Sequence, residues 1–110
     1  MEVFQGRAHL PGGDKEWDIK IEIDWDTKDV TVRIVQAPGG LAEWPGLAVQ
    51  TFGPLDEIVF RTKGIPRVFT HWWHFARSGS GDDLWGIVIG LPDAEGIWRT
   101  CPLPLKKIRE

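Results

Sequence analysis

The segment Arg67–Arg77 holds the side chains best suited to chemistry or binding, because histidines and aromatic residues alternate along it. On a β-strand, successive side chains point to opposite faces. One face would then hold Phe69, His71, Trp73 and Phe75, and the other Val68, Thr70, Trp72, His74 and Ala76. Each face therefore combines aromatic rings, which offer apolar contact, with one imidazole, a titratable donor or acceptor.

Two interpretations of this segment follow. In the first, Phe69, Trp73 and Phe75 belong to the core, His71 is a hydrogen-bonded core histidine, and Trp72 lies flat on the surface. In the second, one face contacts a ligand or a partner, and Trp72 with His74 is the favoured pair. A strand that is apolar on both faces is covered on both sides, or it lines a pocket or an interface.

The same spacing argues against a metal site. His71 and His74 would point to opposite faces of the strand and could not share one ion. The acidic run at Asp24, Asp26 and Asp29 lacks the glycine and the terminal glutamate of an EF-hand loop. We therefore predict no metal ligands and no cofactor.

Catalysis has equally little support. Cys101 has no histidine near it in sequence, and there is no Gly-x-Ser-x-Gly nucleophile elbow. The exposed carboxylates expected on residues 18–24 have no cleft that would desolvate one of them. We assign no catalytic residue, and an enzyme with His71 or His74 as base ranks last among three functional hypotheses.

The first hypothesis is a non-enzymatic β-barrel module that binds a small ligand. The chain has seven Trp and no Tyr, more large rings than one buried face requires. The predicted pocket would hold an apolar, aromatic or sugar ligand. Its predicted ligand-binding residues are Trp72, His74, Trp85, Trp98 and Trp44. Trp44 is included because it lies beside Pro45 in residues 38–46, the longest stretch without strand character, which has room for one helical turn.

The second hypothesis is a structural or protein-interaction domain. Here the surplus aromatic surface forms a homo-oligomer interface or a docking face for another protein. Nucleic acid is disfavoured as a partner. Basic and aromatic residues interleave between Arg61 and Arg77, but the net charge is −3 and no recognition motif is present.

The sequence also indicates in which cellular compartment the protein is expected. The N-terminus has no basic region followed by an apolar run, and no apolar stretch reaches the length of a membrane span. Cys101 is the single cysteine, so no intrachain disulfide can form. We therefore expect a cytoplasmic protein without a membrane segment.

The elements that must position these residues are strands. Apolar residues alternate with charged ones from Trp17 to Trp25, which is typical of a half-buried strand. A turn at Asp26–Asp29 and alternation at Val30, Val32 and Ile34 complete a β-hairpin over residues 16–36.

Further strands are expected where short apolar runs lie between glycine and proline turns. Their ranges are 3–10, 47–52, 57–63, 67–77, 84–91 and 97–101. Pro102 and Pro104 cannot donate to a ladder, so the tail is expected at an edge or on the solvent side. The sequence thus predicts one all-β domain over residues 1–110: an antiparallel meander of seven to eight short strands. It forms a small up-and-down barrel or, alternatively, a two-layer β-sandwich.

Overall fold

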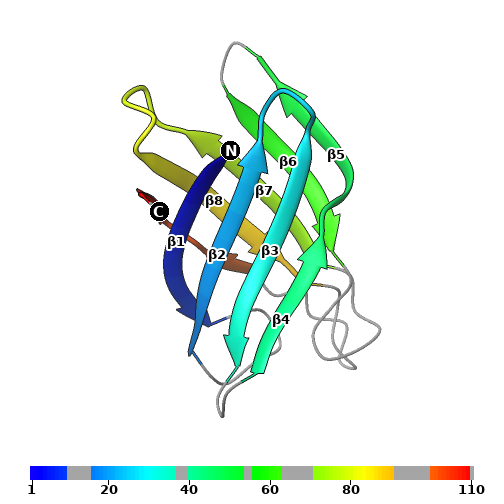
Figure 1. Ribbon diagram of the computed structural model, residues 1–110, viewed down its shortest axis with the longest axis vertical. Helices are drawn as coiled ribbons and strands as arrows, with labels where there is room; N and C mark the ends of the chain where they lie inside the picture. Colours follow the sequence, from blue (N-terminus) through cyan, green and yellow to red (C-terminus); the bar gives the residue numbers. More distant parts are fainter. Residues whose placement is uncertain (10–15, 37–39, 54–55, 63–70, 91–99, 110) are drawn as a thin grey trace.

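The described elements are all antiparallel β-strands (Figure 1). The computed structural model describes residues 1–9, 16–36, 40–53, 56–62, 71–90 and 100–109. The strands are β1 (Glu2–His9), β2 (Glu16–Asp24), β3 (Asp29–Gln36), β4 (Gly40–Pro45), β5 (Leu47–Phe52), β6 (Glu57–Thr62), β7 (His71–Arg77), β8 (Asp83–Ile89), β9 (Thr100–Pro102) and β10 (Leu105–Ile108). No described segment is an apolar helix of membrane-spanning length.

The hairpin predicted over residues 16–36 is confirmed as β2 and β3. Ile19, Ile21 and Ile23 are fully buried, as their alternation requires. The turn begins at Asp24, whose Oδ1 accepts the backbone N–H groups of Asp26 at 3.0 Å and Thr27 at 3.2 Å. These backbone hydrogen bonds lower the pKa of Asp24.

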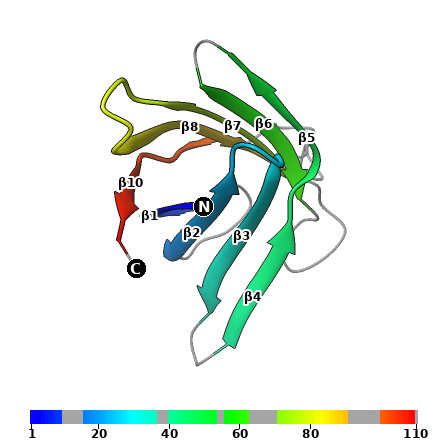
Figure 2. The ribbon, with the colours of Figure 1, turned by 45° about the horizontal axis from the view of Figure 1, so that its top comes forward.

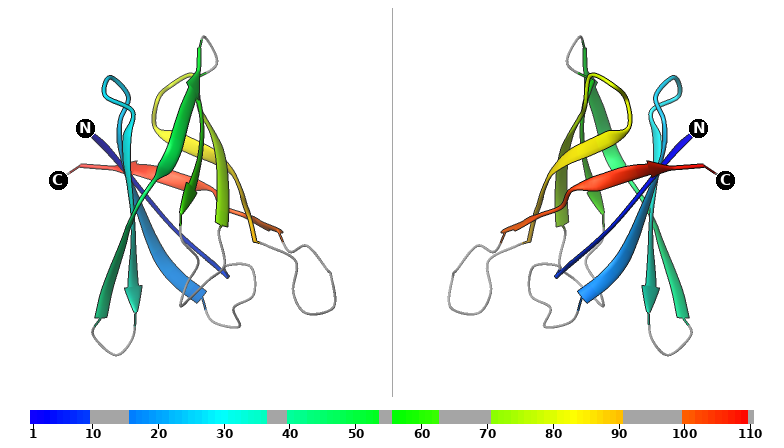
Figure 3. Two further views of the ribbon diagram at one scale, coloured as in Figure 1. Left: turned by 90° about the vertical axis from the view of Figure 1, so that its right-hand side faces the viewer. Right: turned by 90° about the vertical axis from the view of Figure 1, so that its left-hand side faces the viewer.

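The strands form one sheet that curls almost into a closed barrel, as the sequence predicts. The strand order along the sheet is β4-β3-β2-β1-β10-β8-β7-β6-β5. The short strand β9 stands outside this order and pairs with β8. β10 lies between β1 and β8 and joins the two halves of the meander (Figure 2). In the side views, this C-terminal strand, drawn in red, bridges the layer of β1–β4 and the layer of β5–β8 (Figure 3).

The remaining seam lies between β4 and β5, which are separated only by Gly46. β4 pairs with β3, whereas β5 pairs with β6, so the chain changes partner at this glycine. Gly46 donates its backbone N–H to the carbonyl of Val30 at 2.8 Å. A Cβ at Gly46 would lie 3.1 Å from the Val30 Cβ and 3.2 Å from Phe60, so a larger residue would have to displace these neighbours slightly.

β4 corrects one expectation, because residues 38–46 were predicted to lack strand structure. The prolines and glycines that indicate a loop are compatible with β4 because, among the described strands, it lies at an edge of the sheet and pairs with β3. β10 is the other strand that was not predicted. The predicted strand at 97–101 corresponds to β9, but residues 97–99 lie outside the described part of the chain.

The interior is filled by aromatic and aliphatic side chains. Phe60 and Trp73 stack with ring centroids 5.9 Å apart, and Phe75 packs against both. The indole N–H of Trp73 donates to the Thr62 hydroxyl at 2.8 Å, which satisfies the polar atom of this buried ring. These aromatic rings of β6 and β7 pack in one core with buried aliphatic residues of β2 and β3, and β1, β8, β9 and β10 also contribute buried side chains.

Candidate interaction surface

Three of the five predicted ligand-binding residues share one surface. Trp72, His74 and Trp85 all point outward from β7 and β8. Trp44 lies on β4, directly opposite the buried Val32, and packs against the core from the inner side. Trp98 lies outside the described residues.

The alternation along β7 therefore separates its two histidines, as the spacing predicts. His71, Trp73 and Phe75 are buried, whereas Trp72 and His74 are exposed. Residues 67–70, which the sequence assigns to the same strand, lie outside the described residues. The first interpretation of the inner face is confirmed for Trp73 and Phe75, and the outer face remains available for contact.

The outer residues of β5–β9 form three rows across the strands, because directly opposed residues of antiparallel strands point to the same side. The first row is Leu47, Arg61, Trp72, Ile89 and Thr100. The second row is Gln50, Val59, His74, Ile87 and Pro102. The third row is Phe52, Glu57, Ala76 and Trp85. We call this surface the β5–β9 outer face.

The exposed large apolar side chains gather on this face. Among the described residues they are, Met1 aside, Trp85 (62% exposed), Phe52 (47%), Leu47 (41%), Trp72 (40%) and Ile87 (38%). All five belong to the three rows. Isolated exposed apolar residues need no explanation, but a set gathered on one face makes that face a candidate contact surface.

The face also carries charged and polar groups next to the rings. The guanidinium of Arg61 lies 5.4 Å from the centre of the Trp72 ring, within the range of a cation–π contact. The Nε2 atom of His74 lies 3.6 Å from Oε2 of Glu57. Arg61 and Glu57 occupy the first and third rows of β6, so the two signs of charge lie at opposite ends of one strand.

The outer surface of β1–β4 is different in character. Its charges pair with one another: Arg33 contacts Glu22 at 2.6 Å and Glu43 at 3.0 Å. Arg7 contacts Glu16 at 3.1 Å and Asp18 at 2.9 Å. One half of the barrel therefore presents self-paired charges to solvent, and the other presents exposed rings and aliphatic chains.

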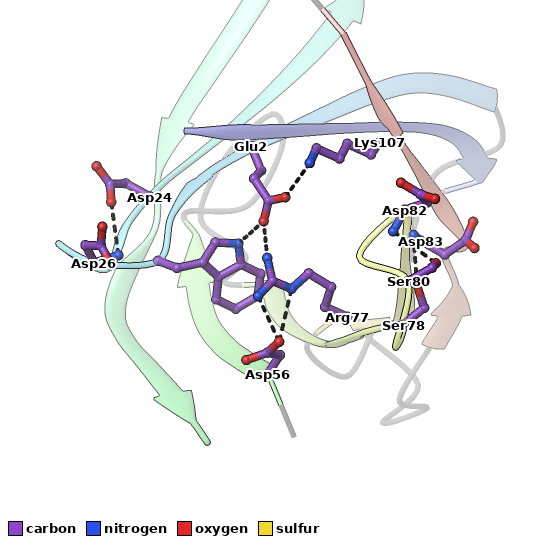
Figure 4. A network of polar contacts seen from close by, with 11 residues as sticks. Glu2, Asp24, Asp26, Asp56, Arg77, Ser78, Ser80, Asp82, Asp83 and Lys107 are labelled. Carbon is purple, nitrogen blue, oxygen red and sulfur yellow. Dashed lines mark hydrogen bonds and ion pairs between the residues drawn. The ribbon is translucent and has the colours of Figure 1, made fainter. Parts of the chain in front are cut away.

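A polar network links the two halves at one end of the barrel (Figure 4). The Glu2 carboxylate accepts hydrogen bonds from the Trp25 indole at 2.6 Å and from Arg77, and it pairs with Lys107 at 2.8 Å. Arg77 also donates to Asp56 at 2.8 Å and lies over the Trp25 ring at 4.6 Å. These contacts join residues on or beside β1, β2, β6, β7 and β10.

The charges of this network stabilise one another. Burial alone would raise the pKa of Glu2, but hydrogen bonds from Lys107 and Trp25 and the charge of Arg77 hold that pKa below its ordinary value. The hydrogen bond to Asp56 raises the pKa of Arg77. Each polar group at the centre is already engaged by the chain itself, so the network acts as a structural clamp.

The described residues offer little support for a metal site or a reactive cysteine. They contain no group of three His, Cys, Asp or Glu side chains that could hold a metal ion. Burial raises the pKa of the Cys101 thiol, which disfavours the reactive thiolate. No protein-family model, curated protein or solved structure matches this chain.

Sequence reasoning missed the contribution of β5 and β6 to this surface. It predicted both strands but did not follow their outward residues, namely Leu47, Phe52, Glu57 and Val59. The alternation in residues 57–63, with Ile58 and Phe60 inward, contained the signal. What the sequence could not provide was the pairing of β5 and β6 with β7.

Proposed function

We infer that this chain is a non-enzymatic protein-interaction domain that docks a folded protein through the β5–β9 outer face. The observation that carries the proposal is that, among the described residues, the exposed Trp, Phe, Leu and Ile side chains all lie on one half of the barrel. Retaining such residues in water has no folding benefit, since they contribute little to the core. Contact with a partner removes them from water and gives them a role.

The size of the face fits this role. Its strands and rows span about 19 Å by 13 Å between Cα atoms, because neighbouring strands lie about 4.8 Å apart and rows are two residues apart. With side chains the whole face, its polar and charged residues included, covers on the order of 400–500 Å². It is enough for the centre of a modest interface of about 600–800 Å² per partner.

The residue types support a protein partner. Trp and Arg are the residues most often found at interaction hot spots, and Trp72 and Arg61 are adjacent here. Val59 and Ile87 flank the imidazole of His74 in the second row, and the charges of Arg61 and Glu57 lie toward the rim. The partner should offer a flat apolar surface, a carboxylate for Arg61 and a cation for Glu57.

The small-ligand function shares Trp72, His74 and Trp85 with this surface. An apolar, aromatic or sugar molecule could stack on these rings. Trp44 points to the other side of the sheet, so a single pocket built from the predicted residues has less support than a contact surface on the outside of the barrel. Small-ligand binding is the competing outcome of the cross-linking experiment.

The test places a photo-crosslinking amino acid at Ile87 and, as a matched control, at Thr31 on the outer surface of β3. Adducts from position 87 but not from position 31 are expected in cells, and mass spectrometry then identifies the protein attached. With that purified protein, Trp85→Gln should weaken binding by roughly tenfold or more, as for a hot-spot residue. Absence of adducts at position 87, together with a change of Trp emission on titration with sugars or apolar probes, would overturn the proposal in favour of a small ligand.

A further inference from the structure

We propose that the partner on the β5–β9 outer face is a second copy of this chain, packed face to face about a two-fold axis. This inference rests on the proposed function, because it names the occupant of the same surface. It is carried by a property of the three rows: they become complementary to themselves when the first and third rows are exchanged.

The symmetry operation is simple. A two-fold axis that lies in the interface along the second row, across the strands, sets β6 over the partner's β6 in the opposite direction. The first row of one copy then faces the third row of the other, and the second row faces itself. Such an isologous contact uses each pairing twice. Two packed sheets lie about 10 Å apart, so opposed residues of facing rows near the axis lie within side-chain reach of each other.

Charge is the first form of complementarity. In this arrangement Arg61 faces the partner's Glu57, and Glu57 faces the partner's Arg61, which gives two ion pairs per dimer. Charges removed from water need such partners, since an unpaired buried charge is costly. On one chain alone, Arg61 and Glu57 are two rows apart on the same strand and the sheet holds them separate.

Shape is the second form of complementarity between the two copies. The large Trp72 faces the partner's Ala76, the smallest side chain among the three rows. Trp85 faces the partner's Ile89, and Phe52 faces the partner's Leu47, so apolar groups meet apolar groups. Alternating large and small residues across facing sheets allow close packing.

The other face-to-face orientation is worse. With the axis parallel to the strands, Arg61 would face the partner's Ile89 and Glu57 would face the partner's Trp85. Both charges would then be desolvated against apolar groups. The outer surface of β1–β4 is also a poor alternative, because Arg33 is already paired with Glu22 and Glu43.

The main experiment uses charge reversal and sedimentation of the full chain. Wild type should form a dimer whose fraction rises with concentration. Arg61→Glu alone places like charges against each other twice per dimer, and so does Glu57→Arg alone. Each variant should therefore dimerise roughly tenfold more weakly or worse. An equimolar mixture of the two variants restores both ion pairs and should dimerise within about threefold of wild type.

Circular dichroism of each variant verifies that the fold persists. A wild type that stays monomeric up to about 1 mM, beyond the micromolar range of modest specific interfaces, would overturn the inference. So would charge-reversed variants that dimerise like wild type, or a mixture that does not recover.

A second measurement tests the axis without altering charge. Ile87 lies in the second row and faces the partner's Ile87. Ile87→Cys should be joined to its own copy by a short bis-maleimide, whereas Thr31→Cys on β3 should not. Failure of this cross-link overturns the proposed axis. If both dimer tests fail while position 87 still forms adducts with an identified protein, the docking face stands and only its occupant is wrong.

Discussion

At the scale of single residues, Arg61 and Arg77 show how the same residue type acts differently by position. Arg61 is exposed on the β5–β9 outer face, whereas the Arg77 side chain is only 23% exposed and contacts both Glu2 and Asp56. In the sequence, both arginines belong to the segment between Arg61 and Arg77 in which basic and aromatic residues interleave. The structure separates them because odd-numbered inward positions of β7 end at Arg77, which closes the barrel rather than facing outward.

The Glu2 clamp predicts a specific loss of stability in acid. Because the pKa of Glu2 is lower in the folded protein than in the unfolded chain, its stabilising contribution is complete above about pH 4.3, the ordinary value for glutamate. It disappears as the pH falls below that value toward the folded pKa. Glu2→Gln should therefore lower the free energy of unfolding by about 1–3 kcal/mol at pH 7, and by much less near pH 3.

Urea titrations between pH 7 and pH 3 measure this difference. Glu43→Gln is the control, because Glu43 forms an ion pair with Arg33 on the exposed surface and should change stability by no more than about 1 kcal/mol. A constant gap between wild type and Glu2→Gln across the pH range would show that the carboxylate charge is not what stabilises the clamp.

At the scale of elements, local pattern determined what could be predicted. The β2–β3 hairpin was predicted to within a residue or two because Ile19, Ile21 and Ile23 repeat with a period of two beside a turn. β4 escaped prediction because it is a proline- and glycine-flanked edge strand, held by pairing rather than by composition. The inner face of β7 was predictable from alternation, but its outward residues acquire neighbours only through β6 and β8.

The contact between β7 and β8 gives a sharp prediction at Gly86. A Cβ there would lie 1.9 Å from the backbone carbonyl oxygen of His74 and 2.6 Å from the Phe75 ring, so paired strands would have to separate. Gly86→Ala should reduce the free energy of unfolding by at least about 3 kcal/mol, the upper range for overpacking. Thermal and urea denaturation followed by circular dichroism measure it.

Gly79 is the matched control, since a Cβ there would meet nothing within 4 Å. Gly79→Ala should be neutral or stabilising by less than about 1 kcal/mol, because alanine restricts the unfolded chain. Equal effects of the two substitutions would contradict the close packing of β8 on β7.

At the scale of the molecule, two unlike half-sheets are joined by a strand from the far end of the chain. β1–β4 carry the self-paired charges and β5–β8 carry the exposed rings, and β10 pairs with β1 and β8 between them. The barrel class was predictable from the number and spacing of short strands. This closure was not, because pairing between residues near the two chain ends leaves no local pattern in the sequence.

The closing strand yields the last prediction. Removing residues 105–110 deletes Leu105, which is 1% exposed, and leaves the edges of β1 and β8 without their partner. Loss of one buried leucine costs about 2–5 kcal/mol, a large share of the roughly 5–15 kcal/mol that stabilises a typical domain. The two unpaired edges would also invite association between chains. The truncated chain should therefore lose its cooperative melting transition and aggregate, as followed by circular dichroism and light scattering.

A chain that ends at Ile108 retains β10 and should melt like wild type. If the chain ending at Pro104 also melts like wild type, β10 does not close the barrel. The two half-sheets are then held together by the core and by the remaining contacts of the Glu2 clamp.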